Sequence, residues 1–424
     1  MPPHSGHRSL HIRTTVILLA TLATPGLARG QATALQPLSR AAAVARALGA
    51  SPRGAALAAD TLAASGRLSA ARAYPNPTLS ATYSKSTPQH HVILDVPLDL
   101  PYARSPRVGA ARAEAASARL TFLAERAALQ LDADKLYTIA LGAGLRARLS
   151  AADAADALRL LRATEARRSA GDASDLEVNL ARVASDQAAN TASADSLEAV
   201  DALIELQAVL ALRTDTIAVA LTDSLTPPAA ADTLVHTATG SASAAPLASM
   251  LRVQAAAQSL TAAQQSLAAQ RRGVFGAPSV QVGVESGDPT GSEPGLLPTV
   301  GVALPIPLFN LNRGEITAAR ADVLRAQAEL DIARREAEAT LTRARRMRAG
   351  AMVRLARDSS TVSAAARNTA LTERGYTEGE LAISDVLEAR RAQRDAESQY
   401  VNDLVAARVS DALIRVLTAP VRNP

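Results

Sequence analysis

The residues whose types and spacing come closest to a chemical site are two adjacent histidines, His90 and His91, at a polar turn between predicted strands. Neighbouring imidazoles can ligate a metal, but one pair without a neighbouring carboxylate or cysteine is weak support for such a site. Glu336 and Glu338 form a carboxylate pair with no sign of a cleft around it. Phosphate loops, Ser-His-Asp spacing and HExxH motifs do not stand out. We therefore predict that the protein is not an enzyme and has no cofactor and no metal site.

A second carboxylate pair, Asp385 and Glu388, lies near the start of a predicted helix close to the C-terminus. Residues three apart on a helix share one face, so both carboxylates point to the same side. On this pattern alone, two solvent-exposed helix carboxylates are the simpler interpretation.

The composition favours long helices rather than a compact globular core. Hydrophobic residues make up 48% of the 424 residues, yet aromatics make up only 2% and Trp is absent. Alanine supplies much of the apolar content, which suits helices packed closely side by side. The absence of Cys excludes disulfides and thiolate metal sites. The 45 basic and 40 acidic residues are interspersed, without the basic block expected of a nucleic-acid-binding protein.

The N-terminus has the pattern of a secretory signal peptide, which we place at residues 1–30. Arg8 and Arg13 form a positive segment, and the apolar segment after them is too short to span a membrane as a helix. Small residues suited to cleavage follow at Gly30 and Ala32. The mature chain has no 18-residue apolar run, so we expect an exported protein without a transmembrane helix.

A repeat with an offset of 208 residues divides the mature chain. The matched positions include Ala110–Glu114 with Ala318–Asp322, Pro97 with Pro305, and Gly171 with Gly379. We predict a first repeat at residues 31–212, a waist linker rich in Thr, Ser, Ala and Pro at 213–245, and a second repeat at 246–424. Each repeat is expected to contain a helix, two strands and a helical hairpin.

The predicted strands alternate between apolar and polar residues, as strands with one apolar face do. The apolar positions are Val92, Leu94, Val96 and Leu98 in the first repeat, and Val280, Val282, Val284, Val300, Val302, Leu304 and Ile306 in the second. Four such strands cannot close a barrel by themselves, and an open sheet edge is not tolerated in a bilayer. If the strands span a membrane, several copies must therefore share one barrel, and three copies give twelve strands.

The predicted helices are unusually long. Those at about Pro106 to Ala166 and Arg313 to Arg374 would each reach roughly 90 Å at ~1.5 Å per residue. They end at turns that contain Gly171, Gly375 and Gly379.

Shorter helices then return towards the strands. Those after the turns are expected at about Asp172 to Leu212 and Glu380 to Leu417. The segments Leu38 to Arg72 and Pro246 to Arg272 complete the return path and lead into strands.

Two segments resemble the TolC family of outer-membrane efflux proteins. One is Tyr74-Pro75-Asn76-Pro77-Thr78-Leu79, before the first strand, and the other is the turn and helix start from Tyr376 to Arg390. The resemblance implies a mainly α fold: a homotrimer with a twelve-stranded outer-membrane β-barrel and an α-helical periplasmic tunnel. It also implies partners: outer-membrane lipid, a periplasmic adaptor protein, and an inner-membrane pump of the resistance-nodulation-division type.

The resemblance also assigns roles to residues. Asp385 and Glu388 match the acidic positions of the pore constriction, where three copies of each would form rings that attract cations. Tyr376 and Glu177 match a pair that latches the closed tunnel. Leu381 stands where better-known members of the family can carry Arg, so the resemblance does not extend to the second latch. The turns at Gly171, Gly375 and Gly379 are the expected contacts for the adaptor.

The resemblance implies an outer-membrane channel that passively conducts small solutes, either drugs or metal cations, and extends into the periplasm. Two alternatives remain open at this stage. A type I secretion duct for polypeptides would have a similar shape. A non-channel periplasmic coiled-coil protein would have long helices without a membrane-spanning sheet.

Overall fold

The computed structural model describes residues 35–228, 247–287 and 295–418. All described residues belong to one compact unit of the chain. The predicted signal peptide at residues 1–30 lies outside the described residues, as do positions 229–245 of the predicted waist.

Helices dominate this unit, with two groups of strands between them. The elements run in the order β1 (Gln36–Leu38), α1 (Arg40–Ala50), α2 (Pro52–Arg72), β2 (Thr78–Tyr83), β3 (His90–Pro97), α3 (Pro101–Ala170), α4 (Asp175–Val209), β4 (Val219–Leu221), α5 (Leu247–Arg272), η2 (Gly273–Phe275), β5 (Ser279–Ser286), β6 (Leu297–Ala303), α6 (Arg313–Glu378) and α7 (Ile383–Thr418). The long helices α3 and α6 have 70 and 66 residues, which corresponds to about 100 Å each at ~1.5 Å per residue.

The start of the first long helix was predicted at Pro106, which is wrong. Helix α3 begins at Pro101, and Pro106 lies buried inside it. Proline has no N–H to donate to the carbonyl four residues earlier, here that of Tyr102. Arg272 at the end of α5 donates its Nη1 to that carbonyl at 3.0 Å, so a neighbouring helix supplies the missing hydrogen bond.

The single helix predicted over Leu38 to Arg72 is also wrong, because α1 and α2 are separate. Ser51 between them has an extended backbone, with φ −70° and ψ 120°. A residue that precedes proline avoids the helical conformation, and Pro52 follows Ser51 directly.

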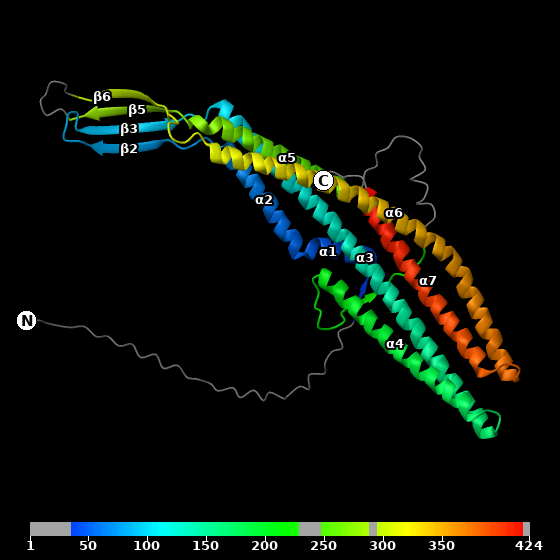
Figure 1. The fold of residues 1–424 in the computed structure, drawn as a ribbon. Helices are drawn as coiled ribbons and strands as arrows, with labels where there is room; N and C mark the ends of the chain where they lie inside the picture. Colours follow the sequence, from blue (N-terminus) through cyan, green and yellow to red (C-terminus); the bar gives the residue numbers. More distant parts are fainter. Residues whose placement is uncertain (1–34, 229–246, 288–294, 419–424) are drawn as a thin grey trace, which may run out of the picture. The chain divides into compact units, whose positions relative to one another are not determined.

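The four predicted amphipathic strands form one antiparallel sheet in the order β2-β3-β5-β6. The two hairpins β2–β3 and β5–β6 join through β3 and β5, with Leu94 opposite Val282 and Val96 opposite Val280. Strands β2 and β6 are the two edges of this sheet within the chain (Figure 1).

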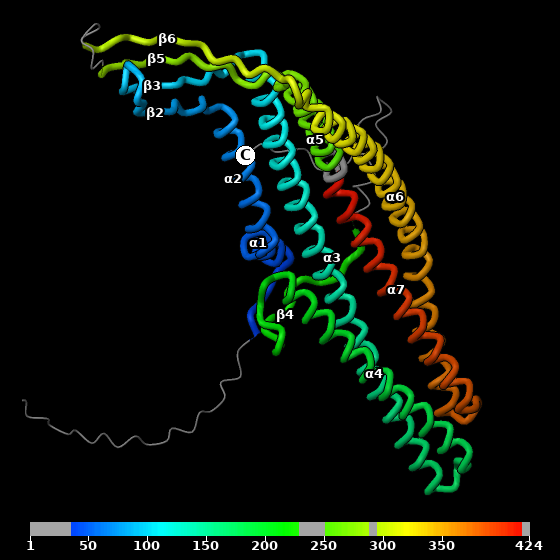
Figure 2. Tube along the Cα trace, turned by 60° about the vertical axis from the view of Figure 1, so that its left-hand side comes forward, coloured from blue at the N-terminus to red at the C-terminus, as the bar shows by residue number. Residues whose placement is uncertain are grey.

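Helix α3 is the central helix of the unit. It packs against α2, α4, α5 and α7, and α6 packs against α5 and α7. Both views show α3 and α7 lying side by side between α4 and α6, which gives a row of helices in the order α4-α3-α7-α6 (Figures 1 and 2).

A short parallel pair, β1 with β4, ties the N-terminal segment to the waist. The fully buried Tyr137 of α3 links both strands to the helices. Its hydroxyl lies 2.8 Å from the carbonyl of Leu38 and 2.7 Å from Oδ2 of Asp223. The side chain of Gln207 on α4 holds the loop that follows this helix, because its amide oxygen accepts a hydrogen bond from the backbone N–H of Ala218 at 2.8 Å. These polar contacts lie beside a buried apolar cluster that includes Leu38, Tyr137 and Leu206.

Candidate functional site

One face of the sheet is apolar and exposed over all four strands. In-register neighbours place Leu79, Leu94, Val282 and Val300 in one row across the sheet. Of these side chains, Leu94 is 38% exposed and Val300 is 75% exposed. An apolar row exposed over four adjacent strands is not the surface of an ordinary water-soluble protein. The face is therefore suited to contact with lipid or with another apolar surface.

The opposite face of the sheet carries polar side chains. Ser80 and Thr299 lie on one cross-strand row, and Asp95 and Gln281 on the next. Such a sheet suits a wall with lipid on one side and water on the other.

The two adjacent histidines lie on opposite faces of this sheet, because side chains alternate along a strand. His90 lies by the apolar face, with its ring centroid 5.3 Å from that of Tyr83. His91 lies on the polar face, with Nδ1 3.3 Å from a carboxylate oxygen of Glu285 on β5. The pair therefore cannot chelate one ion. Glu285 is far from His91 in the sequence and lies beside it only because β5 pairs with β3. The sequence alone therefore did not indicate a carboxylate near the histidines.

At the far ends of α3 and α6 from the sheet, both helices end at a glycine in the left-handed backbone region. Gly171 has φ +91° and Gly379 has φ +80°. The next N–H in each case donates back to a helix carbonyl: Asp172 to Arg167 at 2.9 Å, and Glu380 to Gly375 at 2.8 Å. Other residues resist this conformation, so these glycines fix the two turns.

Gly375 serves a different purpose from Gly379. A Cβ at Gly375 would lie 2.8 Å from Cδ1 of Leu381, so the glycine makes room for this side chain. Leu381, the residue that departs from the family pattern, thus folds back onto the end of α6.

Tyr376 is buried at the junction of the two hairpins. Its hydroxyl lies 3.3 Å from Oγ1 of Thr164 on α3. The guanidinium of Arg167 lies 4.7 Å from its ring centroid and donates to its carbonyl at 3.3 Å. Tyr376 therefore links α6 to α3 within one chain.

Glu177, the predicted latch partner of Tyr376, caps its own helix. Its carboxylate accepts from the backbone N–H of Ser174 at 2.7 Å, and the Ser174 hydroxyl accepts from the N–H of Glu177 at 3.3 Å. This is a capping box at the start of α4. Among the hydrogen bonds of the described residues, none joins Glu177 to Tyr376, so their latch stays a prediction.

Asp385 and Glu388 lie on one exposed side of α7, as the spacing predicted. Ile383, Val386 and Leu387 fill the other side and pack with Tyr376 in one apolar cluster. Asp385 also accepts from the N–H of Ala382 at 3.2 Å, which caps the start of the helix. The two carboxylates are free to face a pore, and their role there stays a prediction.

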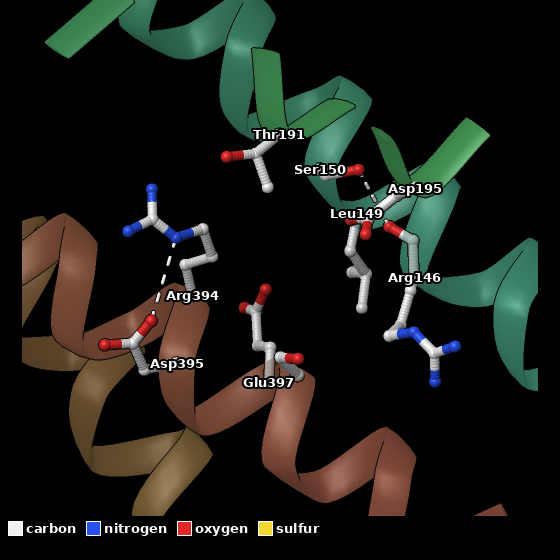
Figure 3. Close-up of a pocket in the computed structure, with 9 residues that line it drawn as sticks. Arg146, Leu149, Ser150, Thr191, Asp195, Arg394, Asp395 and Glu397 are labelled. Atoms are coloured by element: carbon white, nitrogen blue, oxygen red, sulfur yellow. Dashed lines mark hydrogen bonds and ion pairs between the residues drawn. The ribbon is translucent and has the colours of Figure 1, made fainter. Parts of the chain in front are cut away.

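The sequence did not indicate the polar seam between α3 and α7. A cavity of about 180 Å³ lies there, lined by side chains of α3, α4 and α7 that include Arg146, Asp195 and Arg394 (Figure 3). Sequence patterns do not reveal it, because its charges come from three helices whose contact depends on the tertiary fold.

An ion pair joins α3 to α7 in the adjoining cavity of about 330 Å³. Arg394 lies 3.6 Å from a carboxylate oxygen of Asp153. Burial raises the pKa of Asp153, although Arg394 and then Arg390 oppose the shift. Nearer the sheet, a Cβ at Gly142 would lie 2.3 Å from a methyl of Val405, so α3 and α7 pack tightly there. The glycine was a sequence signal for this close approach.

No helix within the described ranges has an apolar stretch sufficient to cross a bilayer. In the same part of the chain, no group of three or more His, Asp or Glu side chains is placed to hold a metal ion.

The comparisons with known proteins give one family model and several solved structures of the same fold. Residues 246–418 match the family model described as outer membrane efflux protein. No curated protein matches the chain.

Several solved structures share the fold over most of the chain. A membrane protein from Pseudomonas aeruginosa is 18% identical with a TM-score of 0.73, and the match covers 89% of this chain and 92% of that one. The outer membrane protein VceC from Vibrio cholerae is 17% identical with a TM-score of 0.73, covering 89% and 95%. The CmeC outer membrane channel of Campylobacter jejuni is 15% identical with a TM-score of 0.70, covering 89% and 84%.

Proposed function

We propose that this chain, whose residues 246–418 match the family model described as outer membrane efflux protein, is the outer-membrane channel of a tripartite efflux system. The single observation that supports this best is the sheet, with its exposed apolar face, its polar face and its two edges, β2 and β6. Such a sheet is not expected in a coiled-coil periplasmic protein that does not span a membrane.

The proposed assembly is a homotrimer in which the strands of three copies close one barrel. Edge β2 of one copy pairs with edge β6 of the next, which gives twelve strands and leaves no unpaired backbone in the bilayer. The apolar face then meets lipid and the polar face lines the lumen. The signal-like residues 1–30 support export, and the helices extend into the periplasm.

The proposed gate lies at the turns, at the opposite ends of α3 and α6 from the sheet. Asp385 and Glu388 line the constriction, and Tyr376 and Glu177 hold it closed. The turns at Gly171, Gly375 and Gly379 meet the periplasmic adaptor, which connects the channel to an inner-membrane pump of the resistance-nodulation-division type. The exposed position of both carboxylates and the left-handed turns support this assignment.

The proposed cargo is small solutes, either drugs or metal cations. A susceptibility screen of a deletion strain against metals and drugs identifies which. A strain with unchanged susceptibility that no longer exports a polypeptide would support the type I secretion duct instead.

Membrane insertion tests the proposal directly. We expect fractionation to place the protein in the outer membrane as a detergent-extractable trimer that conducts ions in planar bilayers. Val300→Arg, on the apolar face, should lower the inserted amount, because Arg at mid-bilayer in such a barrel costs about 2–4 kcal/mol. The matched control Thr299→Arg, on the polar face, should insert normally. A soluble periplasmic monomer would overturn the proposal.

A further inference from the structure

Two aspartates, Asp358 on α6 and Asp403 on α7, lie against each other where these helices pack. Asp403 is only 3% exposed. Its Oδ1 accepts a hydrogen bond from Nε of Arg354 at 2.7 Å, and its Oδ2 accepts one from Nε2 of Gln399 at 2.9 Å. Both oxygens of Asp403 therefore have a donor, and the ion pair with Arg354 favours the charged form of this carboxyl.

Asp358 lacks comparable donors. Its Oδ2 is buried and, as a carboxylate oxygen, has no hydrogen-bond partner among the described residues. A buried acceptor without a partner is costly. The neighbouring carboxyl of Asp403 can only accept while it is charged, so a hydrogen bond between the two aspartates forms only if one of them holds a proton.

The surroundings place this proton on Asp358. Arg354 pairs directly with Asp403, whereas Arg354 and Arg357 act on Asp358 only from its own helix. Burial, and next the hydrogen bond with Asp403, raise the pKa of Asp358. Burial also acts to raise the pKa of Asp403, but the hydrogen bonds that this carboxyl receives, first from Gln399, outweigh burial and lower its pKa.

We propose that Asp358 and Asp403 form a proton-binding site, in which one shared proton stabilises the contact between α6 and α7. The site lies within one chain, so this inference does not depend on the proposed function. Loss of the proton leaves two negative charges in contact, and like charges at this distance repel. The contact between α6 and α7 is therefore expected to weaken when the site loses its proton.

The first repeat has a different arrangement at the matching positions. The offset of 208 residues relates Arg354, Asp358, Gln399 and Asp403, in this order, to Arg146, Ser150, Thr191 and Asp195. These four residues of the first repeat line the cavity of about 180 Å³ (Figure 3). Ser150 is a donor at any ordinary pH, and its hydroxyl donates to the carbonyl of Arg146 at 3.1 Å. The second repeat thus has a carboxyl where the first has a hydroxyl that needs no added proton.

The two pKa shifts set the direction of the pH dependence. The raised pKa of Asp358 means that this group stabilises the fold in acid, and the stabilisation is lost as pH rises through its folded pKa. The lowered pKa of Asp403 means that this group stabilises the fold above the ordinary pKa of Asp, and the stabilisation is lost as pH falls through its folded pKa. The fold is therefore most stable with one proton on the pair, and the unfolding free energy should fall as pH rises from about 4.

Infrared titration of the full chain in detergent, with isotope-labelled aspartate, measures the proton directly. Burial also raises the pKa of Asp153, so the titration uses the Asp153→Asn chain. The carboxylic-acid band should contain a component that persists to higher pH than the other aspartates. Asp358→Asn should remove this component, because an amide does not titrate. Asp403→Asn should move it to lower pH, because the acceptor of its hydrogen bond loses its charge.

Asp322→Asn is the matched control, because Asp322 is an exposed carboxylate on the same helix, and this change should leave the component as it is. A component that survives Asp358→Asn would place the proton elsewhere and overturn the inference. A component that stays at the same pH in Asp403→Asn would show that burial alone holds the proton, and the shared site would then be wrong.

Denaturant titration across the same pH range gives a second measurement. Wild type and Asp322→Asn should lose unfolding free energy as pH rises, and Asp358→Asn should lose most of that dependence. Asp358→Ser introduces the residue of the first repeat and should behave like Asp358→Asn, so the test does not depend on one variant folding. An equal pH dependence in all four chains would overturn the inference, whereas insertion and conduction by the wild-type chain test the proposed function separately.

Discussion

At the residue scale, Asp385 and Glu388 on α7 lead to a prediction about ion selectivity. Asp385 and Glu388 are exposed on one side of the helix, and three copies around an axis would give two acidic rings. We expect Asp385→Ala with Glu388→Ala to lower cation preference, measured as the reversal potential in planar bilayers under a salt gradient. Glu378→Ala is a suitable control, because this carboxylate is exposed at the end of α6, outside the proposed constriction. Full cation selectivity in the double variant would show that these carboxylates do not line the pore.

Tyr137 gives a prediction about stability and its pH dependence. Burial and the hydrogen bond to Asp223 raise its pKa to about 12. The unfolded chain then loses the phenolic proton near pH 10, before the folded chain does, so this residue should lower stability as pH rises from about 10 to 12. Tyr137→Phe should cost about 1 kcal/mol of unfolding free energy at neutral pH. It should also reduce the loss of unfolding free energy at alkaline pH, as measured by denaturant titration in detergent.

Tyr400→Phe is the matched control for this prediction. Tyr400 is half-buried beside the apolar cluster of α6 and α7. If wild type, Tyr137→Phe and Tyr400→Phe all lose the same unfolding free energy at alkaline pH, Tyr137 does not cause that loss.

At the element scale, the seam between α3 and α7 should respond differently to removal of each member of its ion pair. Because burial raises the pKa of Asp153 despite Arg394, its carboxylate disfavours close packing of the seam. Arg394→Gln leaves that charge without its nearest cation and should loosen the seam, which raises single-channel conductance. Asp153→Asn removes the charge and should leave conductance unchanged or lower.

The same ion pair, Asp153 with Arg394, predicts how the conductance changes with pH. A carboxyl whose pKa is raised by packing favours the packed state in acid, and this stabilisation is lost as pH rises. Wild-type conductance should therefore rise with pH, and Asp153→Asn should weaken that dependence. Glu165→Gln is the control, since Glu165 pairs with Arg182 within one hairpin. Equal effects of Arg394→Gln and Glu165→Gln would contradict a role of the seam.

The turn at Gly379 should tolerate no side chain, for reasons of backbone conformation alone. A Cβ there meets nothing within 4 Å, but φ is +80°. Gly379→Val should therefore strain the turn and reduce efflux in a susceptibility assay while the trimer persists. Gly144→Ala is the control, because that glycine also has open space and lies inside a helix. Normal efflux in Gly379→Val would argue against adaptor docking at this turn.

The elements differ in how far the sequence predicted them, and the reasons are physical. Alternation along β3, β5 and β6 predicted the strands, because one face of each is apolar. Gly171 and Gly379 marked the turns, because few residues adopt a left-handed backbone. The start of α3 was misplaced because Arg272 satisfies the carbonyl that Pro106 leaves free. The seam pair Asp153–Arg394 and the His91–Glu285 contact were missed, because both join residues far apart in sequence.

At the scale of the whole molecule, the segment that matches the family model is not an independent domain. Strand β5 pairs with β3 along its whole length, and α5 packs against α3. Both partners belong to the first half of the chain. A chain of residues 246–424 would therefore expose one edge of β5 and the α3-facing side of α5. Unpaired strand edges and uncovered apolar faces favour aggregation rather than folding.

The expected outcome is that neither half assembles alone and that both together do. Residues 1–228, and residues 246–424 placed behind residues 1–30, should each give no detergent-extractable trimer. Their co-expression should restore outer-membrane trimers, because the β3–β5 and α3–α5 contacts can form between two chains as they do within one. Trimers from residues 246–424 alone would show that three copies of this half satisfy β5 and α5 without α3. The two halves would then be separable modules rather than one interlocked fold.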